Sequence, residues 1–231
     1  MDVLLVPGFW LDASSWEGVT ASLEAAGHTV HALTMPGVGV AAPDSSDIGL
    51  ADWVVATVAA IDVRTGPVAL VGHSGGGHAV WGAADARVDR VARVVFVDSI
   101  PLPPGGSITG FPVVDEVVPF PGWDYFPPNE VADIDEATKA RWAARTRSIP
   151  RTVPTDQLSL TDERRFALPV TVITATFPEN DMRDVIAAAP PWASELAALH
   201  DLEIVGIDSG HWPQFSKPRE LAEKLVVALA N

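Results

Sequence analysis

Six short apolar runs along the chain place the tightest limits on how it can fold. They span residues 3–6, 29–33, 68–71, 91–97, 170–174 and 202–207. The runs are almost continuously apolar rather than alternating, which is typical of strands buried on both faces of a parallel sheet. Helical stretches separate them. This alternation predicts an α/β fold, in which a doubly wound, mostly parallel sheet of about six strands has helices on both faces.

The stretches between the runs carry helix signals. Ser14 or Ser15 is predicted to cap a helix that continues through residue 26, with Gly27 just beyond its end. Residues 48–62 and 220–229 carry apolar side chains at three- and four-residue spacing, as amphipathic helices do. We expect these helices to cover the two faces of the sheet.

The length and charge of the chain favour one globular domain that acts on a small molecule. A chain of 231 residues fits a single α/β domain, predicted to span residues 1–231. Fifteen basic residues against thirty acidic ones give a net charge of −15, which repels phosphate backbones and anionic membranes. We therefore expect a small-molecule substrate, no nucleic-acid partner and no membrane association. The sequence leaves the oligomeric state open.

The cysteine count and the N-terminal residues bear on the cellular location of the protein. The chain has no cysteine, which excludes disulfides, thiolate metal sites and a cysteine nucleophile. Its first residues, MDVLLVPGFW, lack a basic stretch and turn at Gly8 after a short apolar run, so we predict a strand and not a signal peptide. No apolar stretch approaches the roughly 18 residues that a membrane span needs. These features predict a cytoplasmic protein.

Residues 99–168 interrupt the alternation of strands and helices. They lie between the fourth and fifth apolar runs and hold ten of the twenty prolines, which forbid long regular elements apart from a helix near residues 137–147. A segment of this length within one domain is usually a lid or a binding segment, so we predict a lid inserted after the fourth strand. Its aromatic residues are predicted to form either an apolar ceiling over a pocket or the core of the lid itself. They are Phe111, Phe120, Trp123, Tyr125, Phe126 and Trp142.

Residues 68–81, VALVGHSGGGHAVW, place a serine between glycines directly after an apolar run. The stretch Gly72-His73-Ser74-Gly75-Gly76 matches the G-x-S-x-G pattern, and a helix is predicted to follow it. This strand–turn–helix setting is typical of a nucleophile elbow. The turn is so sharp that the serine backbone is strained and its neighbours must be glycine. We predict that Ser74 is a nucleophile; the alternative is an ordinary Gly/Ser turn without chemistry.

A serine nucleophile needs a base, and the base needs a carboxylate that orients it. His211 follows the last apolar run, so it is expected at the same carboxyl edge of the sheet as Ser74 and is the predicted base. Asp98 ends the fourth run at that edge and is the favoured acid. Asp181 and Glu179 follow the fifth run and are the alternative acids, although each needs a longer loop to reach the base.

The developing oxyanion of an acyl-transfer reaction needs hydrogen-bond donors. The amide of Gly75, directly after the nucleophile, is one predicted donor. The loop after the first strand is expected to supply the other, through the amide of Phe9. The predicted substrate-binding residues are Trp10, Trp123, Tyr125, Phe126 and Trp142.

The chain resembles the α/β-hydrolase superfamily over nearly all of its length. The motifs that carry the resemblance are Val-Pro-Gly-Phe-Trp at residues 6–10, Gly-His-Ser-Gly-Gly at residues 72–76 and Gly-His-Trp-Pro at residues 210–213. It is most similar to the small, single-domain esterase-like and lactonase-like members, which implies that the strand before the serine is central in the sheet. The resemblance also implies that residues 3–6 correspond to the superfamily's third strand. Two departures are Pro7, where a histidine often stands, and residues 176–178, where an acid commonly falls.

Together these features predict a serine hydrolase that cleaves an ester, thioester or lactone bond of a small, largely apolar substrate, with no cofactor and no metal. The alternatives are a non-hydrolytic enzyme of the same fold (a lyase, a cofactor-free oxygenase or a perhydrolase) or a ligand-binding module with a degenerate triad. Dinucleotide binding is disfavoured because Pro43 follows the glycine pattern at residues 37–42 where a helix should open. Histidines and carboxylates do not occur at metal-ligand spacing.

Overall fold

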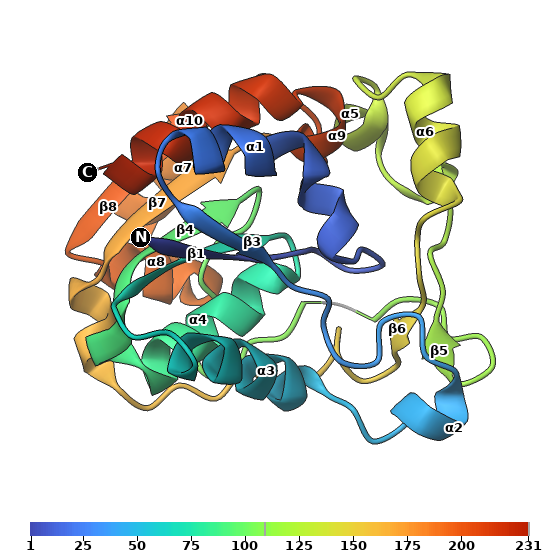
Figure 1. Cartoon of the computed structure of the whole chain (residues 1–231), viewed down its shortest axis with the longest axis horizontal. Helices are drawn as coiled ribbons and strands as arrows, with labels where there is room; N and C mark the ends of the chain where they lie inside the picture. Colours follow the sequence, from blue (N-terminus) through green and yellow to red (C-terminus); the bar gives the residue numbers. More distant parts are fainter. Residues whose placement is uncertain (109, 231) are drawn as a thin grey trace.

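Six parallel strands form the central sheet of the protein, as a computed structural model that describes residues 1–108 and 110–230 shows (Figure 1). Across the sheet their order is β2 (Thr29–Ala32), β1 (Asp2–Val6), β3 (Val68–His73), β4 (Val91–Val97), β7 (Pro169–Thr174) and β8 (Asp201–Gly206). Every pair of neighbours runs parallel. The predicted α/β fold is confirmed, with β3 inside the sheet. Thr109, within the predicted lid, and Asn231, at the end of the predicted domain, lie outside the described residues.

Both faces of the sheet are buried because the side chains of each strand alternate between two apolar clusters. In β1, Leu4 and Val6 belong to one cluster, whereas Val3 and Leu5 belong to the other. The first cluster includes residues of α3 (Leu50–Asp62), α4 (Gly76–Ala86), α7 (Glu179–Ala188) and α8 (Ser194–Ala198). The second includes residues of α1 (Glu17–Ala25) and α10 (Pro218–Ala230). The sheet is therefore covered on both sides, with α3 and α4 opposite α1 and α10 (Figure 1).

The first helix begins later than the sequence predicts. A 3₁₀ helix spans Ala13–Trp16, and the carboxylate of Asp12 caps it by accepting a 2.9 Å hydrogen bond from the amide of Ser14. The prediction that Ser14 or Ser15 caps the helix is therefore wrong: Asp12 caps the 3₁₀ helix, and Trp16, which precedes α1, makes no side-chain capping hydrogen bond. The predicted end is confirmed: Gly27 follows α1 with a φ of 88°, a left-handed conformation that suits glycine.

Most of residues 99–168 lies beyond the carboxyl ends of the strands, on the right of Figure 1, and the last part of the segment returns below α4 to the start of β7. Their regular elements are α5 (Pro128–Val131), α6 (Glu136–Ala143) and the antiparallel pair β5 (Val117–Val118) and β6 (Ile149–Pro150). The predicted helix near residues 137–147 corresponds to α6, which begins one residue earlier because Asp135 caps it and ends four residues earlier, at Ala143. Short helices α2 (Ala42–Ser45) and α9 (Pro213–Ser216) complete the set. That the segment works as a lid stays a prediction.

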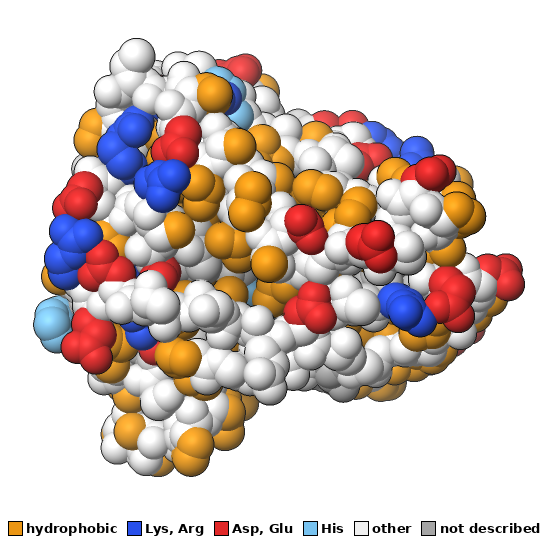
Figure 2. Space-filling view, turned by 90° about the horizontal axis from the view of Figure 1, so that it is seen from below, with side chains coloured by type: hydrophobic (Ala, Val, Ile, Leu, Met, Phe, Trp, Pro, Cys, Tyr) orange, Lys and Arg blue, Asp and Glu red, His pale blue; other side chains and the backbone are white. Residues whose placement is uncertain are grey.

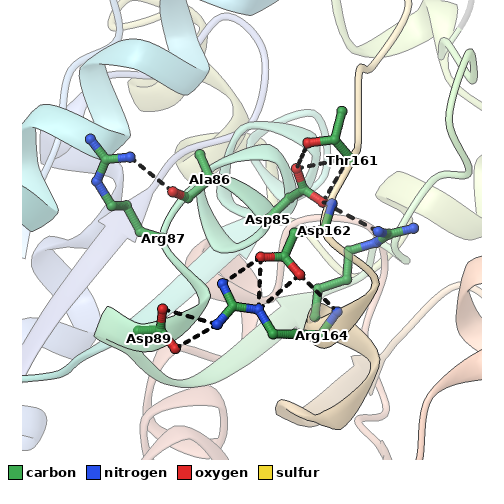
Figure 3. Close-up of polar contacts among 8 residues, drawn as sticks. Asp85, Ala86, Arg87, Asp89, Thr161, Asp162 and Arg164 are labelled. Atoms are coloured by element: carbon green, nitrogen blue, oxygen red, sulfur yellow. Dashed lines mark hydrogen bonds and ion pairs between the residues drawn. The ribbon is translucent and has the colours of Figure 1, made fainter.

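A polar network fixes the end of this segment to the main domain (Figure 3). Asp85, near the end of α4, accepts hydrogen bonds from the amides of Thr161 and Asp162 at 2.8–3.0 Å. Arg164 contacts both Asp162 and Asp89. The chain therefore returns to β7 along a path that side chains of α4 and of the following turn define.

Asp85 also belongs to a buried ion cluster. Arg165 is 3% exposed and donates to Glu195 of α8 at 2.7 and 2.8 Å and to Asp85 at 3.2 Å. The indole of Trp81 donates to the same glutamate at 2.9 Å. Because each charged group has hydrogen-bonding partners of opposite charge, the cluster joins α4, the end of the 99–168 segment and α8 without leaving an unpaired ion in the core.

Figure 2 shows how charge is distributed on one face of the protein. On the face below the sheet, acidic side chains are interspersed with hydrophobic and basic ones rather than gathered in one patch (Figure 2). Among the described residues, every helix is too short or too polar to traverse a lipid bilayer. The predicted cytoplasmic location stays a prediction.

Candidate active site

The turn between β3 and α4 forces Ser74 into a strained backbone. β3 ends at His73 and α4 begins at Gly76, so only two residues make the connection. The φ of Ser74 is 48°, in the left-handed region that residues other than glycine rarely adopt. Its amide donates to the carbonyl of Val97, and its carbonyl accepts from the hydroxyl of Ser99. The neighbouring strand β4 and the loop after it therefore hold the serine in this conformation.

His211 lies between Ser74 and Asp98. Its Nε2 is 2.8 Å from the hydroxyl of Ser74, and its Nδ1 is 2.6 Å from Oδ2 of Asp98. The three side chains come from the carboxyl ends of β3, β4 and β8, which meet at one edge of the parallel sheet. The histidine side chain is 19% exposed and the aspartate side chain 4%. This arrangement can move a proton from the serine hydroxyl to the imidazole while the carboxylate fixes the tautomer.

Asp98 is held as a charged group. Its Oδ1 accepts hydrogen bonds from the amides of Ala175 and Thr176, both at 2.9 Å, and its Oδ2 accepts one from the hydroxyl of Thr176 at 2.8 Å. Burial on its own raises the pKa of this carboxyl, but the hydrogen bonds from His211 and from residues 175–176 outweigh it and lower the pKa to about 2. The group therefore stays ionised throughout the neutral range.

The alternative acids lie elsewhere. Glu179 begins α7 and accepts hydrogen bonds from Arg183 and from the amide of Gly206. Asp181 is exposed on the same helix. The structure brings Asp98, and neither of these two carboxylates, within hydrogen-bond distance of His211.

Phe9 and Gly75, the predicted oxyanion donors, lie against each other. A Cβ atom on Gly75 would be 2.3–2.7 Å from atoms of the Phe9 ring, so only glycine fits at this position. Within residues 1–108 and 110–230, neither amide donates a hydrogen bond to another protein group. The residue after Phe9, Trp10, has a φ of 63°, so the loop after β1 also has a strained position. Two unengaged amides beside a strained serine can stabilise a negatively charged oxygen.

Four of the five predicted substrate-binding residues belong to one aromatic wall that leads to the histidine. Ring centroids are 5.8 Å apart for Trp10 and Phe126 and 4.8 Å apart for Phe126 and Trp212, which itself lies 4.8 Å from the ring of His211. The other two members are Tyr125, 5.4 Å from Phe126, and Trp123, 5.1 Å from Trp212.

Trp142, the fifth, occupies a different position. It is 2% exposed and stacks on Phe215 with ring centroids 4.0 Å apart. Leu11 and Ile134 belong to the same apolar cluster, which joins the 99–168 segment to the main domain. The packing of Trp142 is that of a core residue, which corresponds to the second of the two roles considered for the aromatic residues.

An apolar cavity lies beside Asp98. Its volume is about 180 Å³, and the side chains of Ile100, Phe177, Met182 and Trp192 contribute most of its apolar lining. Phe177 and Trp192 are 38% and 52% exposed, so the cavity has an aromatic rim. A largely apolar group fits these surroundings.

Sequence reasoning missed the support for the histidine. His73 is buried, and burial lowers its pKa to about 3, so its ring is neutral and its Nε2 donates to the carbonyl of His211 at 2.7 Å. Its Nδ1 lies 3.2 Å from the amide nitrogen of Gln214, which donates to it. Thr176 was likewise not predicted as a partner of Asp98. These pairs lie 78 to 141 residues apart in the chain, so local patterns give no signal for them.

Comparisons with known proteins agree with the fold. The model of the alpha/beta hydrolase family matches residues 3–224. The lipase LipV of Mycobacterium tuberculosis is 29% identical over 220 residues, covering 81% of this chain and 82% of that protein. A methylesterase from Arabidopsis has a similar structure, with a TM-score of 0.77, 19% identity and coverage of 100% of this chain and 99% of that one. For a pyrethroid hydrolase from Sphingobium faniae the TM-score is 0.72, the identity 18% and the coverage 100% and 98%.

Proposed function

The chain belongs to the alpha/beta hydrolase family, and on that premise we propose that it is a serine hydrolase that cleaves an ester, thioester or lactone bond of a small, largely apolar substrate. One observation carries the proposal: His211 lies 2.8 Å from the hydroxyl of Ser74 and 2.6 Å from the carboxylate of Asp98. A serine hydroxyl is a weak nucleophile until a positioned base accepts its proton. This contact supplies that base.

In the proposed reaction, the Ser74 oxygen attacks the substrate carbonyl carbon while Nε2 of His211 accepts the hydroxyl proton. The carbonyl oxygen becomes an oxyanion, which accepts hydrogen bonds from the amides of Phe9 and Gly75. When the carbonyl re-forms, the bond to the leaving group breaks and His211 gives its proton to that group. Water then attacks the acyl-serine by the same route, releasing the acid and restoring the serine hydroxyl.

Asp98 orients the base in this scheme. Because its pKa is about 2, the carboxylate is charged when His211 becomes an imidazolium, and the 2.6 Å contact stabilises that cation. The two amides that hold Oδ1 leave Oδ2 for the histidine. The proton of the neutral imidazole therefore lies on Nδ1, and Nε2 is free to accept the proton of Ser74.

The surroundings support an apolar substrate with a carboxylic ester bond. Trp10, Phe126 and Trp212 supply an aromatic wall that ends at the histidine, and the cavity beside Asp98 is lined mainly by apolar side chains. The similar proteins named a lipase and a methylesterase favour an ester among the three candidate bonds. Trp142 is left out of the proposed contacts because it stacks on Phe215.

Two measurements test the proposal. A fluorophosphonate probe should label the wild-type protein at Ser74 and should not label Ser74→Ala. A panel of p-nitrophenyl esters, thioesters and lactones should be hydrolysed by the wild type, with a loss on the order of 10⁶ in Ser74→Ala if the site acts as other serine triads do. Hydrolysis that survives in Ser74→Ala would refute the mechanism. A folded protein that takes no label and turns over no member of the panel would instead favour a non-hydrolytic enzyme or a ligand-binding module.

A further inference from the structure

The loop that carries His211 is held by the 99–168 segment rather than by the sheet alone. The amide of His211 donates to the carbonyl of Glu130 in α5 at 2.9 Å. One oxygen of the Asp133 carboxylate, Oδ2, accepts the amide of Gly210 at 2.9 Å and the hydroxyl of Ser209 at 3.0 Å. Three consecutive residues of the loop therefore bond to a four-residue stretch of the segment.

The loop at residues 209–211 and the stretch at residues 130–133 pack so closely that no side chain fits at position 210. A Cβ atom at Gly210 would lie 2.2 Å from the carbonyl oxygen of Glu130 and 2.6 Å from Oδ1 of Asp133. Gly210 is buried against these two residues. The absence of a side chain at position 210 lets the two backbones approach closely enough for these hydrogen bonds.

The opposite side of the loop is held by the strand before the nucleophile. His73 donates from Nε2 to the carbonyl of His211 at 2.7 Å. The amide and the carbonyl of His211 are thus each fixed by a different part of the chain. With its backbone fixed from both sides, the residue holds its ring 2.8 Å from Ser74 and 2.6 Å from Asp98.

We propose that Asp133 is a positioning residue for His211: its carboxylate fixes the backbone of residues 209–210 and thereby sets the position of the imidazole. The inference rests on the proposed function, because it assigns a role in the same reaction. Asp133 contacts neither Ser74 nor Asp98, and it is an exposed residue of the 99–168 segment. Removing it leaves the amide of Gly210 without an acceptor, whereas the hydroxyl of Ser209 keeps its contacts with Ser216 and with the carbonyl of Gly210. The backbone next to His211 therefore gains freedom.

Replacing Asp133 by asparagine distinguishes a hydrogen-bonding role of the carboxylate from a purely electrostatic one. An asparagine at position 133 offers one carbonyl oxygen, which can accept both the amide and the hydroxyl that Oδ2 now accepts. It carries no charge, however, so a remote effect of the carboxylate on the imidazolium would be lost. Rescue by asparagine therefore separates positioning from charge.

The test compares Asp133→Ala and Asp133→Asn with the wild type in hydrolysis of a p-nitrophenyl ester. A misplacement on the order of 1 Å costs roughly 10²-fold in rate, so kcat of Asp133→Ala should fall by about 10- to 100-fold with KM changed by about twofold at most. Asp133→Asn should keep kcat within about threefold of the wild type. Asp124→Ala is the matched control, because it removes an exposed carboxylate of the same segment that does not contact the loop.

The proposal would be overturned if Asp133→Ala kept the kcat of the wild type or changed only KM. It would also be overturned if Asp133→Asn were as slow as Asp133→Ala. Asp133→Ser carries the same expectation as Asp133→Ala. It keeps a polar side chain at this exposed turn and serves if the alanine variant proves unstable.

A second readout does not need turnover. The proton between His211 Nδ1 and Asp98 should give a low-field NMR signal in the wild type, Asp133→Asn and Asp124→Ala, and the signal should broaden or vanish in Asp133→Ala. An unchanged signal in Asp133→Ala would overturn the positioning role. If the wild type shows the signal but hydrolyses no substrate, the proposed function fails while the positioning role is still decided by the signal in the variants.

Discussion

Replacing Asp98 by asparagine is the sharpest test of the proposed site, because the structure predicts which way the new amide turns. The two backbone amides at residues 175 and 176 both donate to Oδ1. Only the carbonyl oxygen of an asparagine can accept them, so its NH₂ group must face His211. Nδ1 of the histidine then has to accept a hydrogen bond, and the ring proton moves to Nε2.

In that tautomer the histidine cannot take the proton of Ser74, because Nε2 already carries one. We expect kcat of Asp98→Asn to fall on the order of 10⁴-fold, which is the size of the loss when a triad histidine is held in the wrong tautomer. This corresponds to about 5.5 kcal/mol of transition-state stabilisation, at about 1.4 kcal/mol for each tenfold change. KM should change little, since the carboxylate touches the histidine and not the reacting bond.

The assay is steady-state hydrolysis of a p-nitrophenyl ester, with the thermal midpoint as a check on folding. Glu179→Gln and Asp181→Asn serve as controls, because neither carboxylate contacts His211, and both should keep kcat within about twofold of the wild type. If Asp98→Asn kept more than about a tenth of the activity, or if Asp181→Asn lost most of it, the assignment of the acid would be refuted.

Three further predictions concern stability, pH and the oxyanion site. Arg165→Ala leaves the buried carboxylate of Glu195 without its cation, so urea unfolding should show a loss of about 3–5 kcal/mol; a loss below about 1 kcal/mol would contradict the role of the cluster. The pKa of Asp98 falls from an ordinary 3.8 to about 2 on folding, so its contribution of about 2 kcal/mol is present above pH 3.8 and is lost as the pH falls towards 2. Urea unfolding of wild type and Asp98→Asn at pH 5 and pH 2 should show this difference shrinking, and parallel curves would disprove it. Gly75→Ala would push the Phe9 ring away, because the new methyl group lies 2.3 Å from it, and kcat should fall about 10²- to 10³-fold; a fivefold loss or less would count against these amides as the oxyanion donors.

The sequence alone was sufficient for the sheet and for the elbow. All six predicted runs are strands, because a strand buried on both faces must be apolar at nearly every position and few other structures require that. The glycines around Ser74 were equally informative, since a turn of two residues between strand and helix needs them. Local patterns succeed where the constraint lies within about ten neighbouring residues.

The choice among Asp98, Asp181 and Glu179 required the tertiary structure. All three follow apolar runs, and the sequence could only favour the first because the other two needed longer loops. Their separation follows from strand order: β4 lies between β3 and β7, so Asp98 ends beside the serine, whereas Glu179 starts a helix and binds Arg183. The predicted cap of the first helical stretch was wrong for a similar reason. The sequence offers several polar residues there, and only the path of the backbone shows that Asp12 caps the 3₁₀ helix.

What the sequence determined by itself is therefore the fold and the identities of the serine and the histidine that meet at its edge, because periodicity and turn chemistry are written in neighbouring residues. What only the tertiary structure decided is how that histidine is held. Asp133, His73 and Thr176 lie 76 to 141 residues from the residues they bind. Each is an ordinary polar residue in its own segment. It acquires its role because hydrogen bonds require a contact of about 3 Å, and folding alone brings such distant groups that close.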